Sequence, residues 1–404
     1  MSIKGLSTEL RSLTVFRALL EDPTIGKLAD FLEWTEASGG AETDCCTLKR
    51  GIDLYCGFVS SLYNDHTPSL AGHISGVVNM DMNIYIRSIS VNSEVSQPLK
   101  ESVERELAIL QRLADLTAEE LISCIGWDGP LPGFDTEHID IAKVYNYRCA
   151  NIGKFGCGLY AKYYMFYLET DGTITPVRWP DPISLDQLID YKREQDLIIA
   201  NTRAFLAGRP AANTLLTGDA GTGKSSTIKA IVNEFHDEGL RIIEIRKDQL
   251  TLIPHLLDEL SGNPLKFILF IDDLSFTKGD DNFSALKAIL EGSVSARSRN
   301  VVIYATSNRR HLVKESFADR DGDDIHRNDT VQELVSLSER FGLHVTFRKP
   351  NKETYLNIVH HLADAAGITL PEEELDLQAE RFVLSRGRSA RAARQFVDSL
   401  LAAE

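Results

Sequence analysis

The chain has 404 residues, of which 43% are hydrophobic and 25% are charged, and its formal net charge is -16. A chain of this length exceeds what one hydrophobic core usually fills, so we expect two or three folded domains and exclude wholesale disorder. The acidic balance argues against non-specific binding to nucleic acid or anionic lipid, because such binding needs Lys and Arg to neutralise phosphates.

The cysteines and the apolar runs limit the cellular setting. None of the six cysteines forms a Cys-x-x-Cys pair of the zinc or redox kind, so reduced thiols are expected. No run approaches the ~18 to 20 apolar residues that cross a bilayer. The first twenty residues also lack the features of a secretory signal. These observations predict a cytoplasmic protein without a membrane partner.

Apolar residues recur at helical spacing through most of the front of the chain. The segments with this pattern are Leu6 to Leu20, Ile25 to Thr35, Leu48 to Tyr63 and Gln97 to Cys124. Strand-like aromatic and apolar residues follow from Tyr145 to Tyr167. We predict a mainly helical or mixed N-terminal domain over residues 1–180, which would bind a client or partner.

A hairpin and a breaker mark the end of that domain. Thr170-Asp171-Gly172-Thr173 is a turn signal between the predicted strands Tyr163–Leu168 and Ile174–Arg178. Trp179-Pro180-Asp181-Pro182 follows, and two prolines so close interrupt both helix and sheet. We therefore expect the next domain to begin at residue 181.

Strand and helix patterns alternate over residues 181–349. Short apolar strands are predicted at Thr214–Thr217, Arg241–Ile245, Lys266–Ile271 and Val301–Ala305, with helices between them. This alternation predicts an α/β core whose parallel sheet is covered by helices on both faces. From residue 350 to 404 only helical patterns remain, which predicts a small helical C-terminal domain.

A glycine-rich phosphate cradle follows the first of these strands. The segment fits G-x-x-x-x-G-K-[ST] and reads Gly218, Asp219, Ala220, Gly221, Thr222, Gly223, Lys224 and Ser225, with Ser226 next to it. Its glycines let backbone N–H groups converge on phosphate oxygens at a helix N-terminus. Lys224 is expected to reach the β and γ phosphates, and Ser225 to ligate Mg²⁺. An ordinary glycine-rich turn is the alternative, and the full spacing argues against it.

Polar residues end two further strands. Asp272 and Asp273 follow the apolar run Phe267 to Ile271, and Asn308 follows the strand that begins at Val301. Ligands bind at the carboxyl edge of such sheets, so we expect Asp272 to hold Mg²⁺ and Asp273 to activate water. An acidic helix cap is the alternative for the two aspartates. The amide of Asn308 would hold the same water, although asparagine is also common in turns.

These segments resemble the AAA+ ATPases. Gly218 to Ser225 is similar to Walker A, Phe267 to Asp273 to Walker B, and Asn308 to the sensor-1 residue. Ser336-Leu-Ser-Glu-Arg340-Phe-Gly342 resembles the segment with the arginine finger, and Gly387-Arg388-Ser389-Ala390-Arg391 resembles the sensor-2 helix. The resemblance implies a P-loop αβα core over 181–349 and a C-terminal helical lid over 350–404.

A narrower resemblance is to an uncharacterised bacterial AAA+ family described only as ATP-binding proteins. It covers Pro182 to Glu404 and rests on three segments: Asp272-Asp-Leu-Ser-Phe276, Tyr304-Ala-Thr-Ser-Asn-Arg-Arg-His311 and Ser389-Ala-Arg-Ala-Ala-Arg-Gln395. Most AAA+ proteins have glutamate where this chain has Asp273, and aspartate is one methylene shorter. The difference implies slow hydrolysis with a variant base.

The resemblance also implies roles for residues outside the cradle. Arg340 would act as an arginine finger in the site of a neighbouring subunit, which implies a homo-oligomer, although a surface arginine is the plain alternative. Arg391, with Arg388 in reserve, would sense the γ-phosphate. Ile189 and Tyr191 would pack on adenine, although apolar residues at such positions are more often core.

Together these features predict an ATPase that uses ATP and Mg²⁺ to remodel or regulate a macromolecular partner, with a protein client favoured over nucleic acid. A nucleotide-gated switch or loader with little hydrolysis is the main alternative. A P-loop kinase and a nucleic-acid helicase are further alternatives; the polar strand end and helical tail argue against the first, and the acidic charge against the second.

Overall fold

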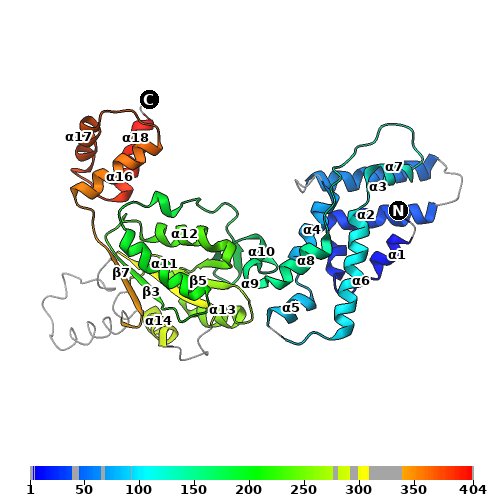
Figure 1. The fold of residues 1–404 in the computed structure, drawn as a ribbon, viewed down its shortest axis with the longest axis horizontal. Helices are drawn as coiled ribbons and strands as arrows, with labels where there is room; N and C mark the ends of the chain where they lie inside the picture. The colour runs from blue at the N-terminus through cyan, green and yellow to red at the C-terminus, as the bar shows by residue number, and fades with distance from the viewer. Residues whose placement is uncertain are drawn as a thin grey trace. The chain divides into compact units, whose positions relative to one another are not determined.

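The computed structural model describes residues 3, 5–38, 45–64, 69–91, 93–275, 281–291, 299–308 and 339–402. The chain divides into two compact units (Figure 1), which we call the helical unit (Met1–Lys162) and the sheet unit (Tyr163–Glu404). The division lies before the boundary expected at residues 180 and 181. The predicted hairpin belongs to the sheet unit because its first strand pairs with that unit's sheet, Met165 opposite Ile242.

The helical unit confirms the predicted helical character of the front of the chain. Its helices within the described residues are α1 (Leu6–Arg11), α2 (Pro23–Ser38), α3 (Cys45–Asn64), α4 (Leu70–Met80), α5 (Ile84–Ser90), α6 (Gln97–Ala114), α7 (Ala118–Ser123), α8 (Ile141–Ala150), α9 (Ile152–Phe155) and α10 (Leu159–Lys162). Large aromatic side chains such as Phe31 and Phe58 are fully buried in its core. Their burial supplies the main stabilisation of this unit.

The helix predicted over Leu6 to Leu20 is wrong as one continuous element. Helix α1 ends at Arg11, and a short 3₁₀ helix, η1, follows at Arg17–Glu21. Between them, the backbone N–H groups of Thr14, Val15 and Phe16 donate to the buried carboxylate of Glu106, each at 3.0 Å. A helix cannot continue there because this distant carboxylate takes the donors that its ladder needs.

Two other predicted boundaries also differ from the structure. Gln97 to Cys124 splits into α6 and α7, because Thr117 and Glu120 form a capping box that begins a new helix. Tyr145 lies within α8 rather than in a strand, and its ring packs edge-on against Phe16 at 5.3 Å. Aromatic residues favour strands, but burial in a helical core outweighs that preference here.

The sheet unit has a seven-stranded sheet in the order β2-β1-β4-β5-β6-β3-β7. The strands are β1 (Met165–Leu168), β2 (Ile174–Pro176), β3 (Thr214–Gly218), β4 (Leu240–Glu244), β5 (Lys266–Ile271), β6 (Val301–Ser307) and β7 (Leu343–Phe347). Every neighbouring pair is parallel except the predicted hairpin β1–β2. The four strands predicted in this core are confirmed, and β7 was not predicted.

Helices bury both faces of this sheet. On one face α11 (Lys192–Leu206) and α12 (Lys224–Phe235) share a core with alternate strand residues such as Leu216 and Ile268. The intervening residues Leu215 and Leu269 are also buried, as a parallel sheet requires. Among the described residues, the other α-helices before the lid are α13 (Ile253–Leu260) and α14 (Asp281–Glu291).

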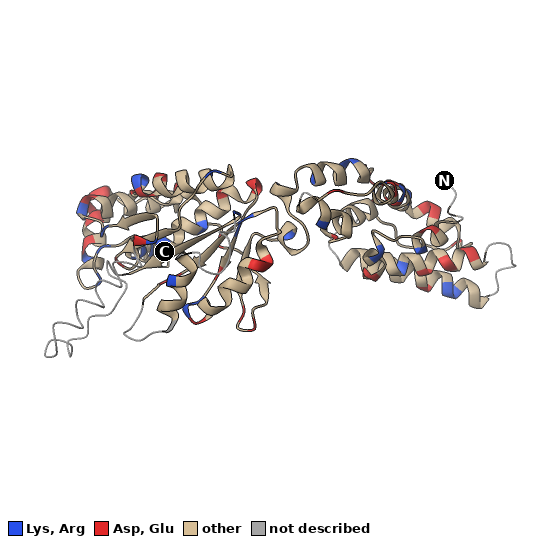
Figure 2. Cartoon of the chain, turned by 90° about the horizontal axis from the view of Figure 1, so that it is seen from below, with Lys and Arg blue, Asp and Glu red and all other residues tan. Residues whose placement is uncertain are grey.

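The C-terminal lid consists of α16 (Lys352–Ala365), α17 (Glu372–Val383) and α18 (Ala390–Leu401), which enclose a separate apolar cluster. The predicted fold class is therefore confirmed: an αβα core with a parallel sheet, a C-terminal helical lid and a mainly helical N-terminal unit. Acidic and basic residues are interspersed along the helices of both units (Figure 2). No helix in the described ranges is long and apolar enough to cross a membrane.

Candidate nucleotide site

The predicted phosphate cradle connects β3 to α12 at the carboxyl edge of the sheet. Gly218 and Gly221 have φ angles of 141° and 77°. Residues with a Cβ atom rarely adopt such positive φ angles. A Cβ atom on Gly218 would lie 2.0 Å from the Phe347 carbonyl oxygen, so only glycine lets the loop pass so close to β7. Among the described residues, the N–H groups of Gly221, Thr222 and Gly223 donate to no acceptor. They are available to an anion.

Lys224 begins α12 and is 5% exposed. Its ammonium donates to the carbonyl oxygens of Gly218 and Asp219 and to Oδ1 of Asn308, each at 2.9 Å. Burial lowers the pKa of this ammonium, and the nearby carboxylates, led by Asp272, partly offset the effect. The lysine is thus a desolvated cation whose partners are mostly neutral, and a bound anion would stabilise it.

An oxygen-rich cluster lies beside the cradle. The Ser225 hydroxyl donates to Oδ1 of Asp272 at 2.6 Å, and the Thr306 hydroxyl donates to the same oxygen. Mg²⁺ prefers hard oxygen ligands and commonly retains several waters, so one hydroxyl and one carboxylate are a fitting donor set. The sequence analysis did not predict a role for Thr306, because threonine is common in strands for its β propensity alone.

Asp273 has a left-handed backbone, with φ of 50°, and its N–H donates to the Thr306 hydroxyl at 3.0 Å. Aspartate tolerates this conformation better than longer side chains do, because its short polar group can bond locally. Oδ1 of Asp273 accepts a 2.7 Å hydrogen bond from the Asn308 amide. The local backbone thus offers a reason for aspartate at this position, and Asn308 links Asp273 to Lys224.

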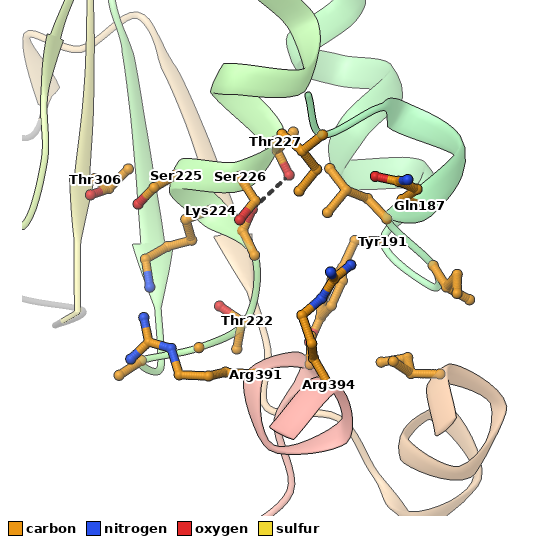
Figure 3. Close-up of a pocket in the computed structure, with 18 of the residues that line it drawn as sticks. Gln187, Tyr191, Thr222, Lys224, Ser225, Ser226, Thr227, Thr306, Arg391 and Arg394 are labelled. Carbon is orange, nitrogen blue, oxygen red and sulfur yellow. Dashed lines mark hydrogen bonds between the residues drawn. The ribbon is translucent and has the colours of Figure 1, made fainter. Parts of the chain in front are cut away.

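These groups border a cavity of about 510 Å³ that is lined entirely by the sheet unit (Figure 3). One end holds the cradle and the carboxylates. Apolar residues line the remainder: Ile183, Leu188, Ile189, Ile358 and Leu362. The Tyr191 ring is 8% exposed and packs on Phe347 at 5.1 Å, while its hydroxyl donates to the Arg348 carbonyl. The cavity therefore combines a polar end with an apolar end.

The arginines of the C-terminal lid have different partners. Arg391 lines the cavity, and its backbone N–H donates to the Gly221 carbonyl at 3.1 Å. Arg388 instead donates two hydrogen bonds to the carboxylate of Glu380, at 3.0 and 2.7 Å. Arg386 lies over the Phe382 ring. Arg386 and Arg388 therefore have partners within the lid, whereas Arg391 borders the cavity.

Arg340 is absent from the residues that line this cavity. It precedes β7, whose first residue, Leu343, pairs with Thr214 at the start of β3. The cradle lies at the carboxyl end of β3. Arg340 and the cradle are therefore at opposite ends of the strands. A strand rises ~3.3 Å per residue, and a five-residue strand separates them by roughly 16 Å. Arg340 is thus placed away from the site of its own chain.

The structure brings most of the predicted site residues together around one cavity. Those that line it are Tyr191, Ala220, Gly221, Thr222, Gly223, Lys224, Ser225, Ser226, Asp272, Asp273, Asn308 and Arg391. Gly218 and Asp219 contribute through their carbonyl groups. Gln187 and Gln195 also line it and were not singled out in the sequence, which offers no motif for them. Arg394 lines it as well and belongs to the segment Ser389 to Gln395 of the narrower resemblance. Phe276, residues 309–311 and residues 336–338 of the motif segments lie outside the described residues.

Comparison with known proteins identifies a family. Residues 161–404 match the family described as "Protein of unknown function (DUF815)". No curated protein matches the chain. A similar solved structure is the RuvB Holliday junction branch migration motor of Thermotoga maritima, with 17% identity, a TM-score of 0.38 and coverage of 55% of this chain. The chain spans 65% of the length of that RuvB chain.

A chain in the HORMA:CdnC:Trip13 complex of E. coli MS115-1 is also similar. It has 13% identity and a TM-score of 0.36, and the alignment covers 53% of this chain and 90% of that one. At these identities and TM-scores, neither likeness carries an argument about this chain. The site geometry described above comes from the residues of this chain.

Proposed function

The chain belongs to the DUF815 family, and from that premise we propose that its sheet unit is an AAA+ ATPase that binds ATP with Mg²⁺ and hydrolyses it. The observation that carries the proposal is the convergence of two kinds of group. Unpaired N–H groups in the cradle and the Lys224 ammonium would attract a triphosphate, and the carboxylates of Asp272 and Asp273 lie beside them.

The residues divide the work of binding. The cradle amides would hold the β-phosphate, and Lys224 would exchange its carbonyl partners for phosphate oxygens. Ser225 and Asp272 would hold Mg²⁺, with Thr306 fixing the Asp272 carboxylate. When bound there, Mg²⁺ neutralises charge on the phosphate oxygens. The exchange strengthens the hydrogen bonds of the Lys224 ammonium, because anionic phosphate oxygens replace neutral acceptors.

Asp273 and Asn308 would position the attacking water. In the structure, Asn308 accepts a hydrogen bond from Lys224 and donates one to Asp273. Once Lys224 turns toward phosphate, the Asn308 carbonyl oxygen is released and can accept a hydrogen bond from the water, while Asp273 accepts its proton. Nucleotide binding and assembly of the hydrolytic site would therefore be coupled through one hydrogen bond.

Coupling to a partner would use the lid and a second copy of the chain. Arg391 lies on the lid and approaches the cradle through Gly221, so its contact with the γ-phosphate would transmit the nucleotide state to the lid. Arg340, at the opposite edge of the sheet, would complete the site of an adjoining subunit in a homo-oligomer. The helical unit would select the client that is remodelled or regulated.

A nucleotide-gated switch is the second candidate, and two observations favour it. Asp273 is shorter than glutamate, and Arg340 does not line the cavity of its own chain. Either feature reduces hydrolysis in an isolated subunit. A switch would bind ATP tightly and change its lid position with little turnover.

Calorimetry and phosphate release with ATP and Mg²⁺ test both candidates. We expect the wild-type chain to bind and hydrolyse ATP, and Lys224→Ala to lose about a hundredfold or more in affinity. Asp273→Asn should keep binding and lose about 10² to 10⁴ in turnover. Lys229→Ala is the matched control, because Lys229 lies on the same helix but faces Glu244 and does not line the cavity.

The outcomes separate the candidates. Binding without phosphate release, at concentrations where the chain self-associates, would favour the switch. No heat from ATP and Mg²⁺ would reject both. Equal losses for Lys224→Ala and Lys229→Ala would show that the cradle lysine has no special role.

A further inference from the structure

Arg394 is a charged residue of the cavity to which the proposed binding of the triphosphate gives no role. It lies on α18, one helical turn after Arg391. The two arginines that precede them in sequence are engaged within the lid, Arg388 with Glu380 and Arg386 with Phe382. In the described part of the chain, Arg394 has neither a hydrogen bond nor an ion pair for its guanidinium. Structural support of the lid therefore does not account for it.

Arg391 and Arg394 reach different ends of the cavity. Residues three apart on a helix share a face, so both side chains can enter the same cavity. Figure 3 shows the Arg391 guanidinium directed toward the Lys224 ammonium and the Arg394 guanidinium directed toward Tyr191. The proximity of Arg391 contributes to the lowered pKa of Lys224, which places that arginine at the phosphate end. Arg394 belongs to the other end.

The end near Arg394 suits a flat, weakly polar group. Tyr191 lies at this end, and Ile189 and Leu362 line the cavity and pack against the apolar cluster of the lid that carries Arg394. A phosphate would gain little from such neighbours. Gln195 adds a directional polar group: it is 4% exposed, and its amide N–H donates to the Leu188 carbonyl at 2.8 Å. That bond orients the amide and leaves its oxygen without a donor among the described residues. A nucleobase edge can supply one.

Resting on the nucleotide site proposed above, we propose that Arg394 covers the face of the nucleobase and sets the contribution of the base to affinity. A guanidinium is planar and weakly hydrated, so it stacks on aromatic rings in a way that an ammonium cannot. The base would lie between this guanidinium and the apolar wall of the cavity. Because Arg394 is on the lid, base recognition requires the lid to be closed over the cradle.

The test compares ATP with ribose 5-triphosphate, which lacks only the base, by calorimetry on the full chain with Mg²⁺. Arg394→Ala should weaken ATP about tenfold and change ribose 5-triphosphate by less than about twofold. Arg394→Lys keeps the charge without the planar face and should lose ATP affinity to a similar extent. Arg391→Ala is the comparison variant and should weaken both compounds alike.

The alternatives give distinct results. Equal weakening of both compounds by Arg394→Ala would place the residue on phosphate or ribose and overturn the proposal, as would unchanged ATP affinity. Full retention of ATP affinity in Arg394→Lys would show that Arg394 acts through its charge alone, and this result would also overturn the proposal. Each of these results leaves the nucleotide site intact, whereas failure of the wild-type chain to bind ATP would reject the site and this proposal together.

Discussion

The two units of the molecule both contain polar groups in sheltered positions, and they use them in opposite ways. In the helical unit, both carboxylate oxygens of the fully buried Glu106 accept hydrogen bonds from the segment Thr14 to Phe16. In the sheet unit, the cradle amides from Gly221 to Gly223 have no acceptor in the described chain. The hydrogen bonds of the first group are satisfied within the protein, whereas the second group is available to the ligand that we propose.

The difference teaches how structural and functional polar groups can be separated. A satisfied buried carboxylate connects distant segments of one core, because leaving its donors unpaired would cost more than ordering them. Buried backbone N–H groups without an acceptor are rare in folded proteins, so a cluster of them beside a cavity indicates access to solvent or a ligand. Satisfaction of hydrogen bonds, rather than burial alone, identifies the candidate site.

The largest effect is expected when the buried carboxylate of Glu106 is removed. Glu106→Ala leaves the N–H groups of Thr14, Val15 and Phe16 without their acceptor, so we expect the helical unit to lose about 3 to 5 kcal/mol of stability. Chemical denaturation followed by circular dichroism measures the loss. Glu104→Ala, on the exposed face of the same helix, is the control. A small effect of Glu106→Ala would mean that the segment is held by its apolar contacts alone.

The cluster of groups beside the cradle is tested through Thr306, which hydrogen-bonds to both Asp272 and Asp273. Thr306→Val removes the donor to Asp272 and the acceptor for the Asp273 N–H. We expect turnover to fall about a hundredfold while the KM for ATP changes only a few-fold, because the phosphate contacts remain. Thr306→Ser should restore most of the turnover. A large rise in KM would instead indicate that Thr306 supports the whole loop.

A smaller effect is expected from the left-handed backbone at Asp273. Asp273→Glu should destabilise the sheet unit by about 1 kcal/mol, because glutamate lacks the local bonding that makes this conformation tolerable. Asp273→Asn should be close to neutral in the same unfolding measurement, since asparagine tolerates the left-handed region. If both substitutions are neutral, the backbone does not explain the aspartate at this position.

The smallest effect is expected from Arg388, and it tests which lid arginine contacts the nucleotide. Arg388→Ala removes the pair with Glu380, which lies away from the cavity. We expect nucleotide affinity to stay within about twofold of the wild-type value, because partly exposed ion pairs contribute little. Arg391→Ala is the contrasting variant and should reduce affinity severalfold or more. A result with these two effects exchanged would make Arg388 the residue that senses nucleotide.

Much of the sheet unit could be predicted because its signals are local. The spacing of the cradle glycines, the apolar run before Asp272 and the alternation of strands with helices all occur within short windows of sequence. Parallel strands end at one edge, so the meeting of Lys224, Asp273 and Asn308 followed from the order of the elements. The local patterns were sufficient because the polar residue after each parallel strand lies at the carboxyl edge of the sheet.

Only the tertiary structure decided the contacts between residues far apart in the chain. The break after α1 depends on Glu106, the left-handed backbone of Asp273 forms where that residue meets Thr306, and the role of each lid arginine depends on its neighbours. Local periodicity carries no information about such partners, because packing and long-range hydrogen bonds form only once the chain has folded. The amino-acid sequence by itself thus determined the phosphate cradle and the αβα core, and folding decided which side chains surround them.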